Sequence, residues 1–264
     1  MITRLTDVDF DLAKQVARNV GGPVPEKPRR SNSGRKSDGL SQSAFMPKEP
    51  TIISRRIAIL VADGVDVVTV QWLKTSIKKE GAFPWIIAPH RGTIYGAEPT
   101  ASKDESVHAD HHFEGQRSTM FDAVIIPPGS HIKMPDSDGF ASDGFASKGR
   151  VIHWVREAFG HLKTIGAIGN GPCSPPTLMS SSLSSSPGVS FLEKALQLPE
   201  IKLAPKGDSG GVFNHYGVVT TWSLTDRTGG LPLDHTFLST LVSEVSRHRN
   251  WDRELACYTK RVAF

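Results

Sequence analysis

The sequence has few cysteines and no long apolar run, and each shortage excludes a class of protein. Two cysteines among 264 residues, Cys173 and Cys257, are too few for a disulfide framework or a cysteine-based metal site. No segment approaches the roughly 20 apolar residues that cross a bilayer. The first residues, MITRLTDVDFDL, lack the basic and apolar regions of a secretory signal. We therefore expect a soluble protein of the cytoplasm, a reducing compartment, with no membrane partner.

Basic residues exceed acidic ones by a small margin, and most of the excess lies in one segment. Lys and Arg number 31, against 27 Asp and Glu. Residues 21–54 hold six basic and three acidic residues together with five prolines, four glycines and six serines. Such a composition buries too little apolar surface to offset the entropy of ordering, which predicts a disordered basic linker. Residues 55–264 are nearly neutral, so the charge balance gives no reason to expect a nucleic-acid partner.

Residues 1–20 show the spacing of a short amphipathic helix. Acidic residues lie near its start, where a helix favours them. The apolar stripe consists of Val8, Leu12, Val16 and Val20. A helix of this length is marginal alone, so we expect the stripe to pack on a partner that need not belong to this chain.

From residue 55 onward, apolar runs suited to buried strands alternate with segments of helical periodicity. The expected strands are 57–61, 84–88, 121–126, 163–168 and 216–221. The expected helices are 67–77 closed by Gly81, 151–162, 191–198, and a last one capped by Asp234 and reaching Val245. A Ser- and Pro-rich loop occupies 172–190. This alternation implies parallel strands joined by right-handed crossovers, so the predicted fold class is α/β, a three-layer sandwich with a mainly parallel sheet.

Three segments follow predicted strand ends, where sheets of this class place their chemistry. They are ADGVD at 62–66, PPGSH at 127–131 and GNGPC at 169–173, and we expect them to cluster. In the third segment, a strand followed by a sharp turn would normally present a nucleophile, but the residue at the turn is Gly169, followed by Asn170. The remaining candidates for acid, base or nucleophile chemistry are Asp63, Asp66, His131 and Cys173.

These candidates also have structural interpretations. Asp63 and Asp66 flank a helix start, where carboxylates accept hydrogen bonds from unpaired N–H groups, so capping is favoured over acid–base catalysis. Cys173 is interpreted first as a small apolar filler and only second as a displaced nucleophile.

The segment HADHHF suggests a weak metal site. In a strand, His108, Asp110 and His112 would lie on one face and could bind a divalent metal. A solvated sheet edge is favoured, because no second pair of Cys or His supports the metal.

The order of three segments, RRIAILVADGVD, FDAVIIPPGS and GHLKTIGAIGNG, closely resembles the C-terminal flavodoxin-like domain of large-subunit catalases. That domain is a branch of the class I glutamine-amidotransferase-like superfamily. Independently, LTDVDFDLAKQVARNVG resembles the final helix of the catalase core, just before the tether to that domain. The resemblance implies that residues 1–20 end the core, residues 21–54 form the tether and residues 55–264 form the flavodoxin-like domain.

The resemblance also implies a vestigial site. Active relatives in the superfamily carry Ala-Ile-Cys-His-Gly at the turn. The matching residues here are Ala167, Ile168, Gly169, Asn170 and Gly171. Both the nucleophile and its neighbouring histidine are missing, so peptidase, amidotransferase or deglycase chemistry is not expected.

Catalase chemistry needs haem between a distal histidine and a proximal tyrosinate. None of Tyr95, Tyr216 and Tyr258 lies in the family's proximal motif, and no distal motif is present. The resemblance therefore implies no cofactor in this chain and haem in the rest of the parent enzyme.

Together these expectations describe a non-catalytic accessory domain of a haem catalase, an enzyme that decomposes hydrogen peroxide. Its partners would be the catalase core and the other subunits of the tetramer, to which it would add stability. An apolar docking face, once free, could hold unfolded chains in the manner of a chaperone. The competing hypothesis is an autonomous hydrolase, deglycase-like enzyme or sensor that uses Cys173 with Asp63 and Asp66.

Overall fold

The computed structural model describes residues 2–28, 51–96, 106–129, 149–170, 188–206, 211–224 and 235–262. The chain forms two compact units, Met1–Glu49 and Pro50–Phe264. Ile52 is 1% exposed and belongs to the core of the second unit. The core of that unit therefore includes a residue that precedes position 55.

In residues 2–28 of the first unit there are two helices, α1 (Ile2–Leu5) and α2 (Phe10–Asn19), where the sequence predicts one. α1 ends at Leu5, and α2 starts after its cap Asp9, whose backbone is extended and whose Oδ1 accepts a hydrogen bond from the Leu12 amide at 2.8 Å. Ala13 and Ala17 are the buried residues of α2, whereas Val8, Leu12 and Val20 of the predicted stripe are exposed.

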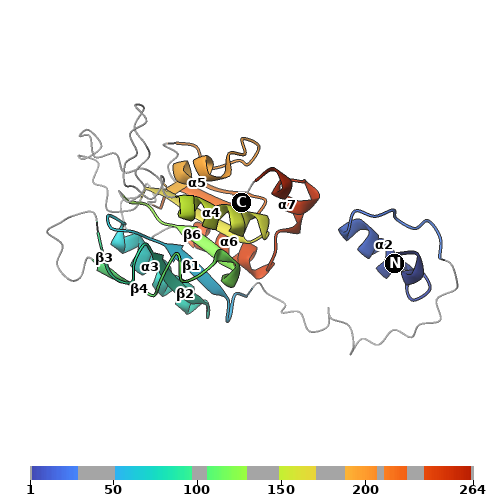
Figure 1. The fold of residues 1–264 in the computed structure, drawn as a ribbon, viewed down its shortest axis with the longest axis horizontal. Coiled ribbons are helices and arrows are strands. Elements are labelled where there is room, and N and C mark those ends of the chain that lie inside the picture. Colours follow the sequence, from blue (N-terminus) through green and yellow to red (C-terminus); the bar gives the residue numbers. More distant parts are fainter. Residues whose placement is uncertain are drawn as a thin grey trace. The chain divides into compact units, whose positions relative to one another are not determined.

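The second unit is built on a seven-stranded sheet with the order β5-β2-β1-β6-β7-β9-β8 (Figure 1). Its strands are β1 (Arg56–Leu60), β2 (Phe83–Ala88), β5 (His111–His112), β6 (Ala123–Ile126), β7 (Thr164–Asn170), β8 (Val212–His215) and β9 (Val218–Ser223). All neighbouring pairs are parallel except β8 with β9. The sheet is therefore mainly parallel, as the alternation of apolar runs and helical segments predicts.

Helices cover both faces of this sheet (Figure 1). One face packs against α3 (Val67–Lys79) and α6 (His235–Ser246), and the other against α4 (Gly149–Gly160) and α5 (Gly188–Leu196). Consecutive residues of β1 divide between the two cores, with Ile57 and Ile59 in one and Ala58 and Leu60 in the other. Burial on both faces explains why these strands are continuous apolar runs, and the three-layer α/β sandwich is confirmed.

Several elements differ from the sequence prediction. Strand β9 begins at Val218, because Tyr216 and Gly217 form a two-residue turn in which both φ angles are positive. A Cβ at Gly217 would also lie 2.1 Å from side-chain atoms of Asn250. Elements that the sequence does not predict are β3 (Gly92–Tyr95), β4 (Ser106–Ala109), β8, the 3-10 helices η4 (Ser118–Met120) and η7 (Thr259–Arg261), and α7 (Trp251–Leu255). The predicted cap Asp234 and most of the loop at 172–190 lie outside the described residues.

Across the described ranges, no helix combines the length and the apolar character that a bilayer crossing requires.

Candidate functional site

The segments that follow β1 and β6 lie side by side at the carboxyl ends of the strands. Val65 forms isolated bridges with Gly96 and with Gly129, and the Asp66 amide donates to the Pro128 carbonyl at 3.0 Å. This is the proximity that parallel strand ends impose. His131 and Cys173, the candidates from the other two segments, lie outside the described residues.

The two aspartates at this edge hold the backbone in place. Asp63 accepts a hydrogen bond from the Tyr95 amide at 3.0 Å, and its other oxygen lies 3.7 Å from His90 Nε2. Asp66 caps α3, with Oδ1 accepting from the Thr69 amide at 3.1 Å and Oδ2 from the Thr69 hydroxyl at 3.2 Å. Burial raises the pKa of Asp66. Both of its oxygens therefore serve the helix start.

The sharp turn expected at Gly169 is not present. Strand β7 continues through Gly169 to Asn170, which pairs with Ser223 of β9. The backbone φ angle of Gly169 is not in the left-handed region. Glycine is therefore required here by close packing and not by a strained turn. A Cβ at this position would lie 2.5 Å from the Trp222 carbonyl oxygen. The pattern IGAIGNG does not distinguish these cases, because a strained turn and a close backbone approach both require glycine.

The start of α5 closes the same edge. A Cβ at Gly188 would lie 2.7 Å from the carbonyl oxygen of Ile168 and 2.9 Å from that of Ile126. Gly188 and Val189 are both buried. The backbone of α5 thus packs directly on the ends of β6 and β7.

The proposed face of His108, Asp110 and His112 is not formed. His108 is exposed on β4, His112 belongs to β5, and the chain bends at Asp110 between them. Asp110 Oδ2 accepts from the Ile86 amide at 2.7 Å, and His112 Nδ1 accepts from the Gly115 amide at 3.0 Å. The single strand assumed from the sequence was wrong, since the bend takes the two histidines to different sheets. Within the described ranges, His, Cys, Asp and Glu form no group of three that could hold a metal ion.

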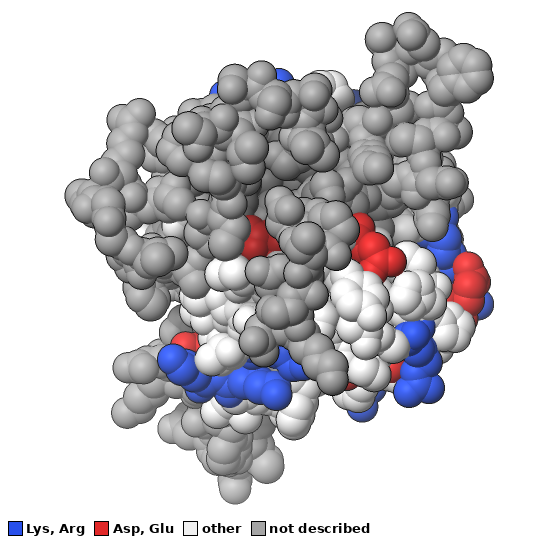
Figure 2. All heavy atoms as spheres, turned by 90° about the vertical axis from the view of Figure 1, so that its left-hand side faces the viewer, with Lys and Arg blue, Asp and Glu red and all other residues white. Residues whose placement is uncertain are grey.

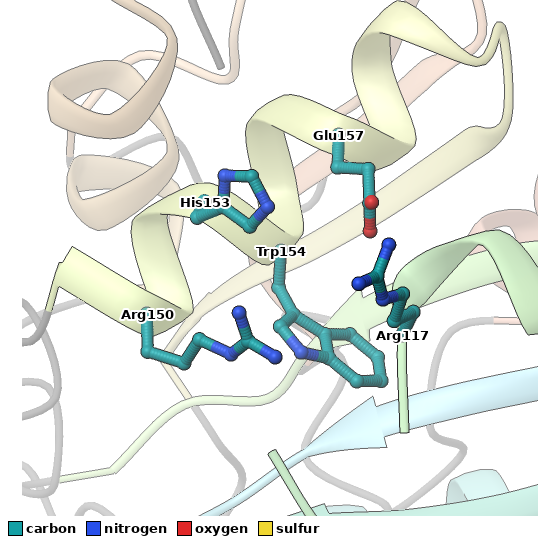
Figure 3. A pocket seen from close by; sticks show the side chains of 5 residues that line it. All are labelled: Arg117, Arg150, His153, Trp154 and Glu157. Carbon is teal, nitrogen blue, oxygen red and sulfur yellow. The ribbon is translucent and has the colours of Figure 1, made fainter. Parts of the chain in front are cut away.

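Sequence reasoning missed a polar hollow on α4, whose lining includes no residue of the segments 62–66, 127–131 and 169–173 (Figure 3). It has a volume of about 80 Å³ and is lined by Arg117, Arg150, His153, Trp154 and Glu157. Four of these residues lie on α4 at intervals of three and four, so they share one side of the helix. This spacing was the only feature of the sequence that indicated the hollow. The fifth, Arg117, comes from the segment before η4, and only the tertiary structure brings it there.

Figure 2 shows the unit from the side to which the carboxyl ends of the strands point. Residues of both charge signs occupy the described part of this face, with Lys and Arg gathered along its lower edge. The described surface in this view is therefore not uniformly basic.

Most of this chain is similar in sequence to one region of large catalases. Residues 53–200 match a family described as the C-terminal domain found in long catalases. The chain is 36% identical over 269 residues to catalase-1 of Neurospora crassa and 38% identical over 269 residues to catalase A of Aspergillus fumigatus. These alignments cover 100% and 99% of the chain but 32% of each relative, so the chain spans about a third of their length.

More distant matches agree. Catalase HPII of Mycobacterium avium is 32% identical over 253 residues, covering 96% of the chain and 30% of the relative. Among solved structures, a two-domain protein of Anabaena variabilis with DJ-1/ThiJ/PfpI-like and ferritin-like domains has a TM-score of 0.51 at 16% identity. That match covers 78% of this chain and 55% of the other, and it supports the fold alone.

Proposed function

The chain belongs to the family of C-terminal domains found in long catalases, and on this basis we propose that it is a non-catalytic accessory domain of a large-subunit haem catalase. The observation that carries the proposal is the packing of Gly169 against Trp222. At the position where active relatives of the resembled superfamily carry a cysteine, this chain has neither a reactive group nor space for one. The peroxide chemistry would belong to the rest of the parent enzyme.

The tyrosines of this chain do not fit haem. Tyr95 is 57% exposed at the end of β3. Tyr216 lies in the β8–β9 turn, and its ring packs edge to face against that of Tyr258 with 4.9 Å between centroids. None of the three lines the hollow on α4, whose volume of about 80 Å³ is also below the roughly 300 Å³ at which ligand pockets begin. We therefore place the haem outside this chain.

Exposed apolar side chains support a packing role. At the amino ends of the strands, Ile53 is 67% exposed and Phe83 is 56% exposed. On α7, Trp251 and Leu255 are one turn apart and are 62% and 61% exposed. A surface of this kind could pack on the catalase core or a neighbouring subunit of a tetramer, which would add buried area and slow unfolding.

The proposed order of the chain places the end of the core at residues 1–20, a tether at 21–54 and the accessory domain after it. The exposed residues Val8, Leu12 and Val20 fit this order, because the remainder of a core could cover them.

Turnover by the isolated chain tests the proposal. The purified 264-residue protein is expected to produce no oxygen from hydrogen peroxide and to hydrolyse no amide or ester above the buffer rate. In a long catalase that ends in this sequence, deletion of residues 51–264 should leave kcat per haem unchanged and shorten the half-life at high temperature. Steady turnover by the isolated chain, or an unchanged half-life after the deletion, would contradict the proposal.

A chaperone-like holding activity is a second candidate, supported by the apolar pair on α7. The isolated chain is then expected to suppress thermal aggregation of an unrelated protein at equimolar ratio. A Trp251→Ser/Leu255→Ser variant should suppress less. No suppression by the parent chain would remove this candidate.

The competing enzyme hypothesis predicts a reactive Cys173 assisted by Asp63 or Asp66. The contacts of both aspartates with backbone amides favour a structural role. Thiol titration separates the hypotheses, because a nucleophilic Cys173 would react as a thiolate well below the ordinary cysteine range.

A further inference from the structure

Four ionisable side chains converge on the hollow of α4 (Figure 3). Arg150, His153 and Glu157 follow one another at intervals of three and four residues on α4, and Arg117 reaches the hollow from another segment. The buried indole of Trp154 forms its floor. A water-sized group needs roughly 10–15 Å³ of such space, so about 80 Å³ accommodates a small oxyanion of a few heavy atoms.

The two guanidinium groups retain donors for such an anion. Among the described residues, the Arg117 side chain has no hydrogen-bond or ion-pair partner. Arg150 Nη2 donates to the Phe113 carbonyl only at 3.4 Å. Arg150 Nε lies 3.4 Å from a Glu114 carboxylate oxygen, and it is occluded from solvent without a hydrogen-bond partner in the described structure. Glu114 is 70% exposed, so its screened charge leaves Arg150 available.

Glu157 decides which oxyanion can enter. Its Oε2 accepts a hydrogen bond from the buried Ser118 hydroxyl at 2.5 Å, which fixes the carboxylate beside the hollow. In Figure 3 this carboxylate lies on the side of Arg117, while the Arg150 guanidinium lies beside the indole. A fixed carboxylate repels a fully deprotonated anion but accepts a hydrogen bond from one that carries an acidic proton. At neutral pH phosphate carries such a proton and sulfate does not.

We propose that this hollow binds inorganic phosphate and discriminates against sulfate. Arg117 and Arg150 donate to the phosphate oxygens, and His153 supplies a further ring N–H. Oε1 of Glu157, the oxygen not bonded to Ser118, accepts a hydrogen bond donated by the P–OH group. The site does not depend on the accessory role proposed above.

Isothermal titration of the purified 264-residue protein, in a low-salt buffer without phosphate or sulfate, tests the site. Inorganic phosphate is expected to bind at least tenfold more tightly than sulfate. A parallel titration with O-phosphoserine at neutral pH is a control, because the second pKa of its monoester is about 6 and most of it has lost the P–OH proton. It should therefore bind more weakly than inorganic phosphate, and tighter binding would contradict the role given to Glu157. Phosphate binding no tighter than sulfate binding would overturn the proposal.

Two variants assign the roles. Arg117→Met should weaken phosphate binding at least tenfold, whereas the matched variant Arg91→Met, which removes the same charge from an exposed turn, should change it less than twofold. Glu157→Gln keeps an acceptor for Ser118 but removes the charge, so the phosphate-to-sulfate ratio should fall from at least ten to near one. Equal losses in the two arginine variants, or an unchanged ratio in Glu157→Gln with its thermal midpoint retained, would show an adventitious ion only.

Discussion

A Cβ atom on Gly169 would lie 2.5 Å from the carbonyl oxygen of Trp222 and 3.0 Å from its Cα. Trp222 belongs to β9, which is hydrogen-bonded to β7 along the length of both strands. The neighbouring atoms are backbone, so they cannot move without disturbing the pairing of the two strands. Position 169 is thus closed by packing, so a side chain there would disturb the neighbouring strand.

Substitution at Gly169 should therefore destabilise the protein. We expect Gly169→Ala to lower the free energy of unfolding by about 2 kcal/mol, the middle of the range for overpacking in a core. Gly169→Cys should be at least as destabilising and should gain no hydrolase activity. Urea denaturation at constant temperature measures the change.

Gly166 of the same strand is the matched control. A Cβ there would lie 3.3 Å from Leu241 Cδ1 and 3.4 Å from Phe237 Cζ, which are ends of side chains that can adjust. Gly166→Ala should cost about 1 kcal/mol, the low end of the range for overpacking, because the neighbouring side chains can adjust. Equal losses at the two positions would contradict the packing argument.

Arg253 should be among the most costly side chains to remove. It is completely buried and donates to the carbonyl oxygens of Phe159 at 2.7 Å, Lys163 at 3.2 Å and Tyr216 at 2.6 Å. Arg253→Met would leave buried carbonyls without these partners, at about 1–3 kcal/mol each. We expect a total loss of about 3 kcal/mol or more in chemical denaturation. Arg261→Met, which removes a partly exposed pair with Glu200, should cost less than about 1 kcal/mol.

Lys163 should make stability depend on alkaline pH. Burial, with a smaller contribution from the Arg249 charge, lowers the pKa of Lys163 from 10.5 to about 8. Below pH 8 both the folded and the unfolded chain hold the proton. Between pH 8 and 10.5 only the folded chain releases it, so the free energy of unfolding should rise with pH in this window.

Comparison with Lys163→Met isolates this contribution from other lysines. The variant loses hydrogen bonds to the carbonyls of Ser118 and Thr119 and is expected to be less stable at every pH. The difference between the two proteins in urea midpoint should be larger at pH 9.5 than at pH 7. A constant difference would show that Lys163 keeps its proton in the folded state throughout.

Asp66 should behave as a helix cap. We expect Asp66→Ala to lower the free energy of unfolding by about 1 kcal/mol, because the Thr69 amide loses its acceptor. Asp66→Asn, which retains a side-chain oxygen, should cost less than the alanine variant. If the protein instead showed catalytic activity, and Asp66→Asn abolished that activity without changing the free energy of unfolding, Asp66 would act in acid–base chemistry.

The first βα unit was predictable because its local signals agree. The apolar run of β1, the cap at Asp66 and the left-handed Gly81 after α3 each act within a few residues. Strand β8 was not predictable in the same way. It has a half-buried, mixed pattern, and its pairing depends on the positive φ of Tyr216, a residue that rarely adopts it.

The candidate site was likewise predictable only where local sequence signals were sufficient. The sequence identified the strand-end segments, since parallel strands must bring their carboxyl ends to one edge. The weak metal site considered from the sequence required one strand across His108 and His112, but the bend at Asp110 is fixed by a hydrogen bond to Ile86, 24 residues earlier. Contacts at that separation leave no local signal.

The layer architecture, the family and the absence of a cysteine at position 169 followed from the sequence, because periodicity and residue identity are properties of the chain alone. The tertiary structure decided that Gly169 lies in a straight strand against Trp222 and that Arg117 joins the face of α4. Both depend on distances between segments that are far apart in sequence, and packing in the folded core sets those distances.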